Sequence, residues 1–261
     1  MKLTWHGNAA LLVEAGEETV AFDPFTGIPA GAAHPEPDAA SAAAFRAAKA
    51  VFATHGHFDH IMQIPALYAR GTVPIYATDT PCRTLARRGV PAERLHRLAP
   101  GDEIRLGALT IRAYQGRHCR FDAALIARMA CAPRVWKNAL HALRLLYWNR
   151  IYPENGETVF YELRADGKRL EIMGSMGLDG ATEYPAGADA LVLPFQGRSD
   201  PARLGETLVA RLQPKAVLLD HFDDSFPPLT ATVDTAAFEA LIARRYGIPC
   251  RTLGRGETIA I

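Results

Sequence analysis

The sequence predicts an α/β (α+β) fold in which two mixed β-sheets pack face to face and helices cover both outer surfaces, a four-layer αββα sandwich. The two halves of the chain share one plan, with predicted strands followed by helices, further strands and a further helix. Apolar residues make up 49% of the 261 residues, which is enough to bury a large core. We therefore expect a single domain over residues 1–261, with a helical insertion at about 121–152.

The first half is expected to begin with short strands joined by tight turns. Gly16-Glu17 joins the second strand to the third, and Asp23-Pro24 ends the third because proline cannot donate to a neighbouring strand. Residues 25–44 are rich in Ala, Gly and Pro and predict a long loop that leads into an Ala-rich helix. The expected strands are Leu3–Trp5, Ala10–Glu14, Thr19–Phe22, Ala50–Ala53, Pro74–Ala77, Glu103–Leu106 and Leu109–Tyr114, and the expected helices are Ala39–Ala48, Met62–Tyr68 and Pro81–Arg88.

The second half repeats this plan after the insertion. Ala165-Asp166-Gly167-Lys168 is a strong turn signal between two strands, and a Gly-Ser pair follows the second of them. Strands and helices then alternate to the end of the chain. The expected strands are Glu157–Arg164, Arg169–Met173, Ala190–Pro194, Ala216–Leu219 and Thr258–Ile261, and the expected helices are Pro201–Leu212 and Thr235–Tyr246.

Three histidines and a carboxylate fall within six residues directly after the buried strand Ala50–Ala53. His55 and His57 are two residues apart and point the same way, whereas Asp59 and His60 follow where the loop turns. Imidazole and carboxylate suit zinc, with manganese or iron as alternatives, better than calcium or magnesium. The alternative is a polar loop that is merely rich in histidine. The spacing favours a metal site at the carboxyl edge of the sheet.

The insertion at 121–152 has high helical propensity and is divided by Pro133. Residues 117–152 hold seven basic residues and one acidic residue, although the whole chain has a formal charge of +1. One interpretation is an ordinary amphipathic helix with a solvated face. The others are a cap that attracts an anionic substrate, a contact in a homo-oligomer, or a contact with a membrane surface. We expect the apolar stripe of Trp136, Leu140, Leu143 and Tyr147 to pack against the body.

The His55–His60 stretch resembles the HxHxDH signature of the metallo-β-lactamase superfamily of metallohydrolases. The resemblance assigns one metal to His55, His57 and His118, and a second metal to Asp59, His60 and His221. One or two divalent ions are therefore expected, with zinc preferred. Many members place a bridging Asp where this chain has Ser175 after Gly174, so the second ion is expected to bind more weakly.

The resemblance also indicates which residues support the ligands. Asp23 is expected to hold the metal-binding loops, and Asn8 either approaches the metals or serves as a turn residue. Trp5-His6-Gly7-Asn8, Asp23-Pro24-Phe25 and His221-Phe222-Asp223 look most like the branch that contains L-ascorbate phosphate lactonase.

The implied function is hydrolysis of a small, anionic, ester-type substrate, a lactone or a phosphodiester, by a metal-bound hydroxide. Asp59 and His221 are the expected catalytic residues, and Arg117 and Arg120 the expected contacts with a negatively charged substrate. The alternatives are a phosphodiesterase acting on a lipid or nucleotide, and a non-catalytic metal-binding or scaffold protein. No basic exosite indicates a nucleic-acid substrate.

Two further observations bear on where the protein works. The four cysteines are scattered, with no CxxC pair, which is typical of a reducing compartment. No signal-like segment or run of 18 uncharged apolar residues appears, so neither export nor a membrane span is predicted. We therefore expect a cytoplasmic protein.

Overall fold

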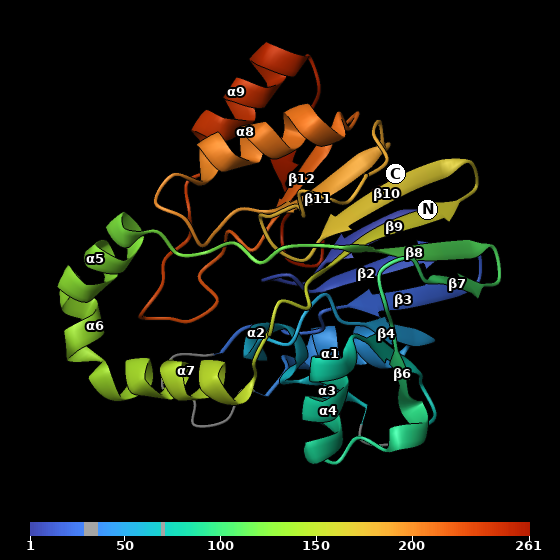
Figure 1. Cartoon of the computed structure of the whole chain (residues 1–261), viewed down its shortest axis with the longest axis horizontal. Helices are drawn as coiled ribbons and strands as arrows, with labels where there is room; N and C mark the ends of the chain where they lie inside the picture. Colours follow the sequence, from blue (N-terminus) through green and yellow to red (C-terminus); the bar gives the residue numbers. More distant parts are fainter. Residues whose placement is uncertain (29–35, 69–70) are drawn as a thin grey trace.

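A computed structural model describes residues 1–28, 36–68 and 71–261. Its architecture is two seven-stranded mixed sheets packed face to face, with helices outside each sheet (Figure 1). The predicted αββα fold class is confirmed. Parts of the expected loop at 25–44 lie outside the described residues.

The first sheet has the strand order β14-β1-β2-β3-β4-β5-β6. Strands β3 to β6 are parallel to one another, whereas β14, β1, β2 and β3 are antiparallel neighbours. The bounds are β1 Lys2–Trp5, β2 Leu11–Ala15, β3 Glu18–Phe22, β4 Ala50–Phe52, β5 Ile75–Ala77, β6 Leu95–Arg97 and β14 Thr258–Ala260. The expected final edge strand is thus present, and it pairs with β1.

The second sheet has the strand order β13-β12-β11-β10-β9-β8-β7. Strands β10 to β13 are parallel, and β7 to β10 form an antiparallel meander. The bounds are β7 Glu103–Leu106, β8 Leu109–Gln115, β9 Val159–Ala165, β10 Lys168–Met173, β11 Ala190–Pro194, β12 Val217–Asp220 and β13 Cys250–Thr252.

Three apolar clusters hold the layers together. The central cluster lies between the sheets, where alternate residues of β9 such as Tyr161 and Leu163 meet Phe22 and Phe52 of the first sheet. A second cluster joins the first sheet to α1 Ala39–Arg46, α2 Phe58–Ile61, α3 Ile64–Leu67 and α4 Asp79–Arg87. A third joins the second sheet to α8 Pro201–Leu212 and α9 Ala236–Tyr246.

Several helix boundaries follow from local capping. The Asp38 carboxylate accepts a hydrogen bond from Ser41 N at 2.9 Å at the start of α1, and Asp200 caps α8 just before Pro201. Gly247 ends α9 in the left-handed conformation, with φ of +68°. These signals explain why the predicted bounds of α8 and α9 agree closely with the structure.

Some local predictions were wrong. The expected helix Met62–Tyr68 is two short helices, α2 and α3, and the first begins four residues earlier, within the histidine cluster. Strand β6, which contains His96 and pairs with β5, was not anticipated. Strand β13 was not anticipated. Short edge strands are defined by the neighbour they pair with, which the local sequence does not specify.

The insertion forms three helices, α5 Ala123–Cys131, α6 Pro133–Lys137 and α7 Ala139–Ile151, rather than the two expected pieces. They form an arc at one side of the molecule (Figure 1). The expected burial of the apolar stripe was wrong, because Trp136, Leu140, Leu143 and Tyr147 are 59–83% exposed. Helix α7 instead turns its other apolar side, with Trp148, toward the body. No helix in the described ranges is long and apolar enough to cross a bilayer.

Candidate metal centre

The Thr54–His60 segment leaves the carboxyl end of β4, which lies between the parallel strands β3 and β5. All three residues of β4 are buried, so the strand is fixed on both faces. His57 precedes α2, and Asp59 and His60 lie in that helix. Gly56 admits a close approach by the chain, since a Cβ there would lie 2.2 Å from the Pro153 carbonyl oxygen.

The structure brings His55, His57 and His118 together. Each offers one ring nitrogen, and these nitrogens all lie within 4.8 Å of one another. His55 Nε2 and His57 Nδ1 are 3.1 Å apart. Two ligands of a tetrahedral zinc ion, each bonded at about 2.1 Å, are separated by roughly 3.4 Å. His118 joins the group from the loop that follows β8.

The three imidazoles of this group are held in the neutral form. Burial lowers the pKa of His55 well below its ordinary value, and the neighbouring imidazoles lower it further. Burial also lowers the pKa of His57 to about 4 and lowers the pKa of His118. His118 Nδ1 donates to the Cys119 carbonyl at 2.7 Å, which leaves its Nε2 as an acceptor. At neutral pH the group offers lone pairs to a cation.

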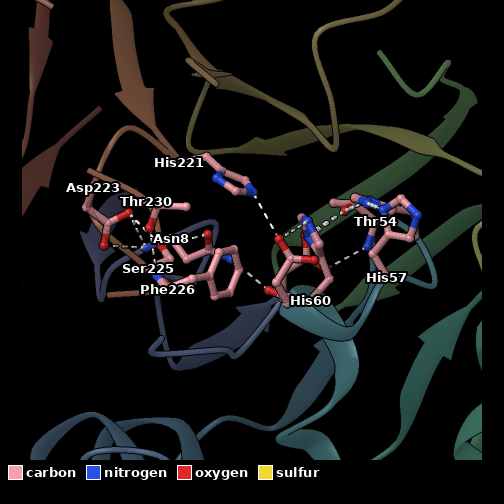
Figure 2. Close-up of polar contacts among 12 residues, drawn as sticks. Asn8, Thr54, His57, His60, His221, Asp223, Ser225, Phe226 and Thr230 are labelled. Atoms are coloured by element: carbon pink, nitrogen blue, oxygen red, sulfur yellow. Dashed lines mark hydrogen bonds and ion pairs between the residues drawn. The ribbon is translucent and has the colours of Figure 1, made fainter. Parts of the chain in front are cut away.

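Asp59, His60 and His221 form a second group, whose ligand atoms also lie within 4.8 Å of one another. His221 Nε2 donates to Asp59 Oδ2 at 3.2 Å (Figure 2). Burial opposes ionisation of Asp59, but His60 and His221 lower its pKa well below the usual range. Burial would lower the pKa of His221, yet its hydrogen bond to Asp59 raises that pKa to about 9. This group therefore contains an internal ion pair.

The two groups are immediate neighbours. The ring centroids of His55 in the first group and His60 in the second are 3.8 Å apart. His60 Nε2 lies 3.9 Å from Asp59 Oδ2. The chain thus has two adjacent three-donor groups of imidazole and carboxylate, the chemistry that suits zinc, manganese or iron.

The Asp23 carboxylate contacts both groups, directly at His60 and through Thr54 at His55. Its carboxylate accepts from Thr54 N at 2.7 Å, from Thr54 Oγ1 at 2.5 Å and from His60 Nδ1 at 2.8 Å. The bond to His60 leaves Nε2 of that ring for a cation. Asp23 is buried, and its φ of +43° turns the chain out of β3. The donor set and its carboxylate support both fit a divalent metal ion.

Asn8 is a structural link. Its Nδ2 donates to the Asp59 carbonyl at 2.7 Å, and its own carbonyl accepts from His221 N at 2.9 Å. Asn8 N donates to the Asp223 carboxylate, and Ser225 Oγ donates to Asn8 Oδ1 at 3.0 Å (Figure 2). Asn8 joins the β1–β2 loop to the segments that carry Asp59 and His221.

The other predicted site residues lie around His118. Ser175 Oγ accepts from Cys119 N at 3.0 Å, so the serine fixes the loop that carries His118. Arg117 and Arg120 lie on either side of His118 and are exposed. The Arg117 guanidinium is close enough to Asp179 to contribute to lowering the pKa of that carboxyl group, after the hydrogen bonds from Ala181 and Thr182.

Sequence reasoning did not single out Thr54, Asp223 or Ser225 as parts of the site. Thr54 Oγ1 links Asp23 to His55 Nδ1, which is 3.1 Å away. The available signals were positional, since Thr54 precedes the first histidine and Asp223 lies two residues after His221. Their roles depend on contacts with residues more than 30 positions away.

Comparisons with known proteins show which family the chain resembles. A family model described as a beta-lactamase superfamily domain matches residues 18–222. A metal-dependent hydrolase from Methanoregula boonei is 37% identical over 270 residues, covering 100% of this chain and 98% of that protein.

Two solved structures show the same fold. A metallo hydrolase from the hyperthermophilic archaeon Ignicoccus hospitalis KIN4/I matches with a TM-score of 0.68 and 19% identity, over 99% of this chain and 97% of that one. Zn²⁺-bound PqqB from Methylobacterium extorquens matches with a TM-score of 0.62 and 15% identity, over 100% of both chains.

Proposed function

Because the chain belongs to the metallo-β-lactamase superfamily and is a metal-dependent hydrolase, we propose that it hydrolyses a small, anionic, ester-type substrate, a lactone or a phosphodiester. The observation that carries this proposal is the adjacency of the two three-donor groups, linked by the 3.8 Å contact between His55 and His60.

His55, His57 and His118 are the proposed ligands of one divalent ion, and Asp59, His60 and His221 of a second, with zinc preferred over manganese or iron. Such an ion lowers the pKa of a coordinated water to about 7 and polarises a carbonyl or phosphoryl oxygen. Ser175 offers a hydroxyl where a bridging carboxylate would add charge, so the second group is proposed to bind its ion less tightly.

Asp59 and His221 are the proposed catalytic residues. The depressed pKa of Asp59 keeps its carboxylate ionised at neutral pH, so a free oxygen accepts a hydrogen bond from the attacking water and orients it. His221 N donates to the Asn8 carbonyl, which fixes the imidazole against Asp59. A nucleophilic serine or cysteine is not needed in this scheme.

The preference for an anion rests on charge beside His118. Arg117 and Arg120 are both exposed there and would attract a carboxylate or phosphate group. The Trp5–Asn8, Asp23–Phe25 and His221–Asp223 motifs favour a substrate like that of the lactonase branch. Within the structure, Asn8, Asp23 and Asp223 join the ligand-bearing loops to one another.

Metal analysis followed by a hydrolysis screen tests the proposal. The purified protein should carry up to two ions per chain and hydrolyse members of a panel of lactones, phosphodiesters and thioesters. Treatment with a chelator should remove this activity, and zinc, manganese or iron should restore it. Protein that retains no metal and hydrolyses nothing after metal addition would favour the scaffold alternative.

A double variant tests the proposed preference for an anionic substrate. Arg117→Gln combined with Arg120→Gln should raise KM for an anionic substrate several-fold, with less effect on a neutral analogue and none on metal content. The exposed Arg87→Gln and Arg244→Gln together provide the matched control, because they remove equal charge from α4 and α9. Equal KM values for the two double variants would contradict the role of Arg117 and Arg120.

A further inference from the structure

The arm formed by α5, α6 and α7 differs from the rest of the surface in its apolar exposure. Every large hydrophobic side chain that is exposed in the described part of the chain lies between Phe121 and Tyr147. These residues are Phe121, Ile126, Met129, Trp136, Leu140, Leu143, Leu146 and Tyr147. Soluble proteins expose such side chains singly, so a concentration on one segment indicates a contact surface.

Helix α7 carries apolar side chains both toward the body and toward solvent. Leu145, Trp148 and Ile151 pack against the cluster under the first sheet. Leu140, Leu143 and Tyr147 of the same helix are exposed and face away from the body. The body covers only the side of α7 that carries Trp148, so the exposed apolar side chains of this helix have no apolar environment.

Helices α5 and α6 contain no buried residue. Trp136 on α6 is 70% exposed, yet its Nε1 already donates to the Ala130 carbonyl at 2.6 Å. The one polar atom of the indole is therefore paired within the arm, and the exposed ring can enter an apolar phase without losing a hydrogen bond to water.

Positive charge is interleaved with these apolar side chains. The basic residues of the arm are Arg128, Arg134, Lys137, Arg144 and Arg150. No acidic residue occurs between 123 and 152. The preceding Asp122 is engaged at the root of the arm, because it accepts from Leu125 N and Ser199 N and lies 3.4 Å from Arg198.

We propose that α5–α7 form a docking surface for an anionic lipid bilayer, with the apolar side chains entering the interface and the basic side chains contacting lipid phosphates. Charge decides between this occupant and a second copy of the chain. A two-fold dimer through the arm would oppose two basic segments whose residues 123–152 include no acidic residue, whereas an anionic membrane supplies the complementary charge.

Both ends of the arm lie close to residues of the candidate metal centre. Trp148 packs against Phe58 with ring centroids 5.7 Å apart, and Phe58 stands between His57 and Asp59. At the other end, α5 begins at Ala123, five residues after His118. Docking through the arm would therefore hold the ligand-bearing loop close to the bilayer surface.

Vesicle binding by the intact, metal-loaded protein tests this inference without any activity measurement. Vesicles of phosphatidylcholine and phosphatidylglycerol at about 2:1 should bind the protein in flotation, and added salt should weaken binding. Vesicles of phosphatidylcholine alone should bind much less. Equal binding to both vesicle types, or binding to neither at low salt, would overturn the proposal.

Charge and apolar variants separate the two contributions. Arg128→Gln, Arg134→Gln and Lys137→Gln together should weaken binding to anionic vesicles by roughly 100-fold, since each basic residue near the surface contributes several-fold. The matched control is Arg46→Gln, Arg87→Gln and Arg244→Gln on other helices, which should bind like the wild type. Leu140→Gln, Leu143→Gln and Leu146→Gln should abolish binding and leave the melting temperature unchanged, because these side chains are exposed. Binding retained by either arm variant would contradict the proposal.

Tryptophan fluorescence locates the contact. Trp136 is the exposed member of the three tryptophans, since Trp5 and Trp148 are 4% and 9% exposed. Anionic vesicles should shift the emission to the blue, and Trp136→Phe should remove the shift while binding persists. A dimer in light scattering that becomes a monomer in the three-leucine variant, without vesicle binding by the wild type, would assign the arm to a second copy instead.

Discussion

The two groups of candidate ligands differ in charge although they share an edge of the fold. His55, His57 and His118 are three imidazoles whose pKa values are lowered by burial, so they are neutral at physiological pH. The other group contains a carboxylate, Asp59, and that carboxylate raises the pKa of His221 to about 9. The all-imidazole group can therefore bind a cation without losing a proton, whereas His221 in the other group is protonated at neutral pH.

The difference in charge predicts how each group would respond to a metal. The all-imidazole group has no proton to lose at neutral pH, so only desolvation and geometry oppose binding. In the second group an ion must displace the proton shared by His221 and Asp59. The two groups can therefore be distinguished by mutation, by pH and by competition with a chelator.

The largest effect is expected from removing a donor of the all-imidazole group. His118→Ala should reduce the hydrolytic rate by more than about 100-fold. Loss of a residue that only supports a metal ligand typically costs about 10- to 100-fold, and His118 is itself a proposed ligand. Metal analysis should show the loss of one ion per chain. His96→Ala removes an exposed histidine from β6 and should change neither quantity. Full metal content in the His118 variant would contradict the assignment of His118 to one metal with His55 and His57.

Removing the Asp23 carboxylate should weaken metal binding at the two ligand groups by different amounts. Asp23→Asn should weaken metal binding by about 10- to 100-fold, mainly at the second group, because Asp23 bonds directly to His60. The effect on the first group passes only through Thr54. Metal titration of the variant, with its melting temperature as a check on folding, measures the difference. Equal losses at the two groups would show that Asp23 acts on the whole loop.

The raised pKa of His221 predicts a pH dependence for the second group only. A proton on His221 competes with the ion, and a smaller fraction of the ring is protonated as pH rises. Affinity at this group should therefore increase by up to about tenfold per pH unit from neutrality and level off above a pH of about 9. Affinity at the first group should stay constant above a pH of about 6.5, the ordinary pKa of histidine. Competition with a chelator at several pH values measures both, and parallel curves would contradict the comparison.

The smallest effect is expected at Ser175. Without a bridging carboxylate, the second group should lose its ion first during dialysis against a mild chelator. Ser175→Asp should raise occupancy of that group several-fold, while its carboxylate can still accept the hydrogen bond from Cys119 N. Ser175→Ala is the control that removes the hydroxyl without adding charge. If both ions leave together and the aspartate changes nothing, the proposed weakness of the second group is wrong.

Local patterns were reliable where local chemistry decides the structure. Helix α8 has the predicted bounds because Asp200 and Pro201 fix its start, and β11 has them because its whole run is apolar. Periodicity failed in α7, which is apolar on two sides, so spacing alone could not choose the buried one. Trp136 also lies on a different helix from Leu140, because the helical conformation is interrupted at Asn138.

The fold class and the local set of metal donors could be predicted from the sequence, because strand alternation and the spacing from His55 to His60 are short-range properties. His118 and His221 were expected from the family resemblance, and the tertiary structure brings them to the loop after β4. It also makes Asn8 a link between Asp59 and His221 and leaves one side of α7 uncovered. Each of these outcomes depends on contacts between segments far apart in the chain, and such contacts leave no period or spacing in the local sequence.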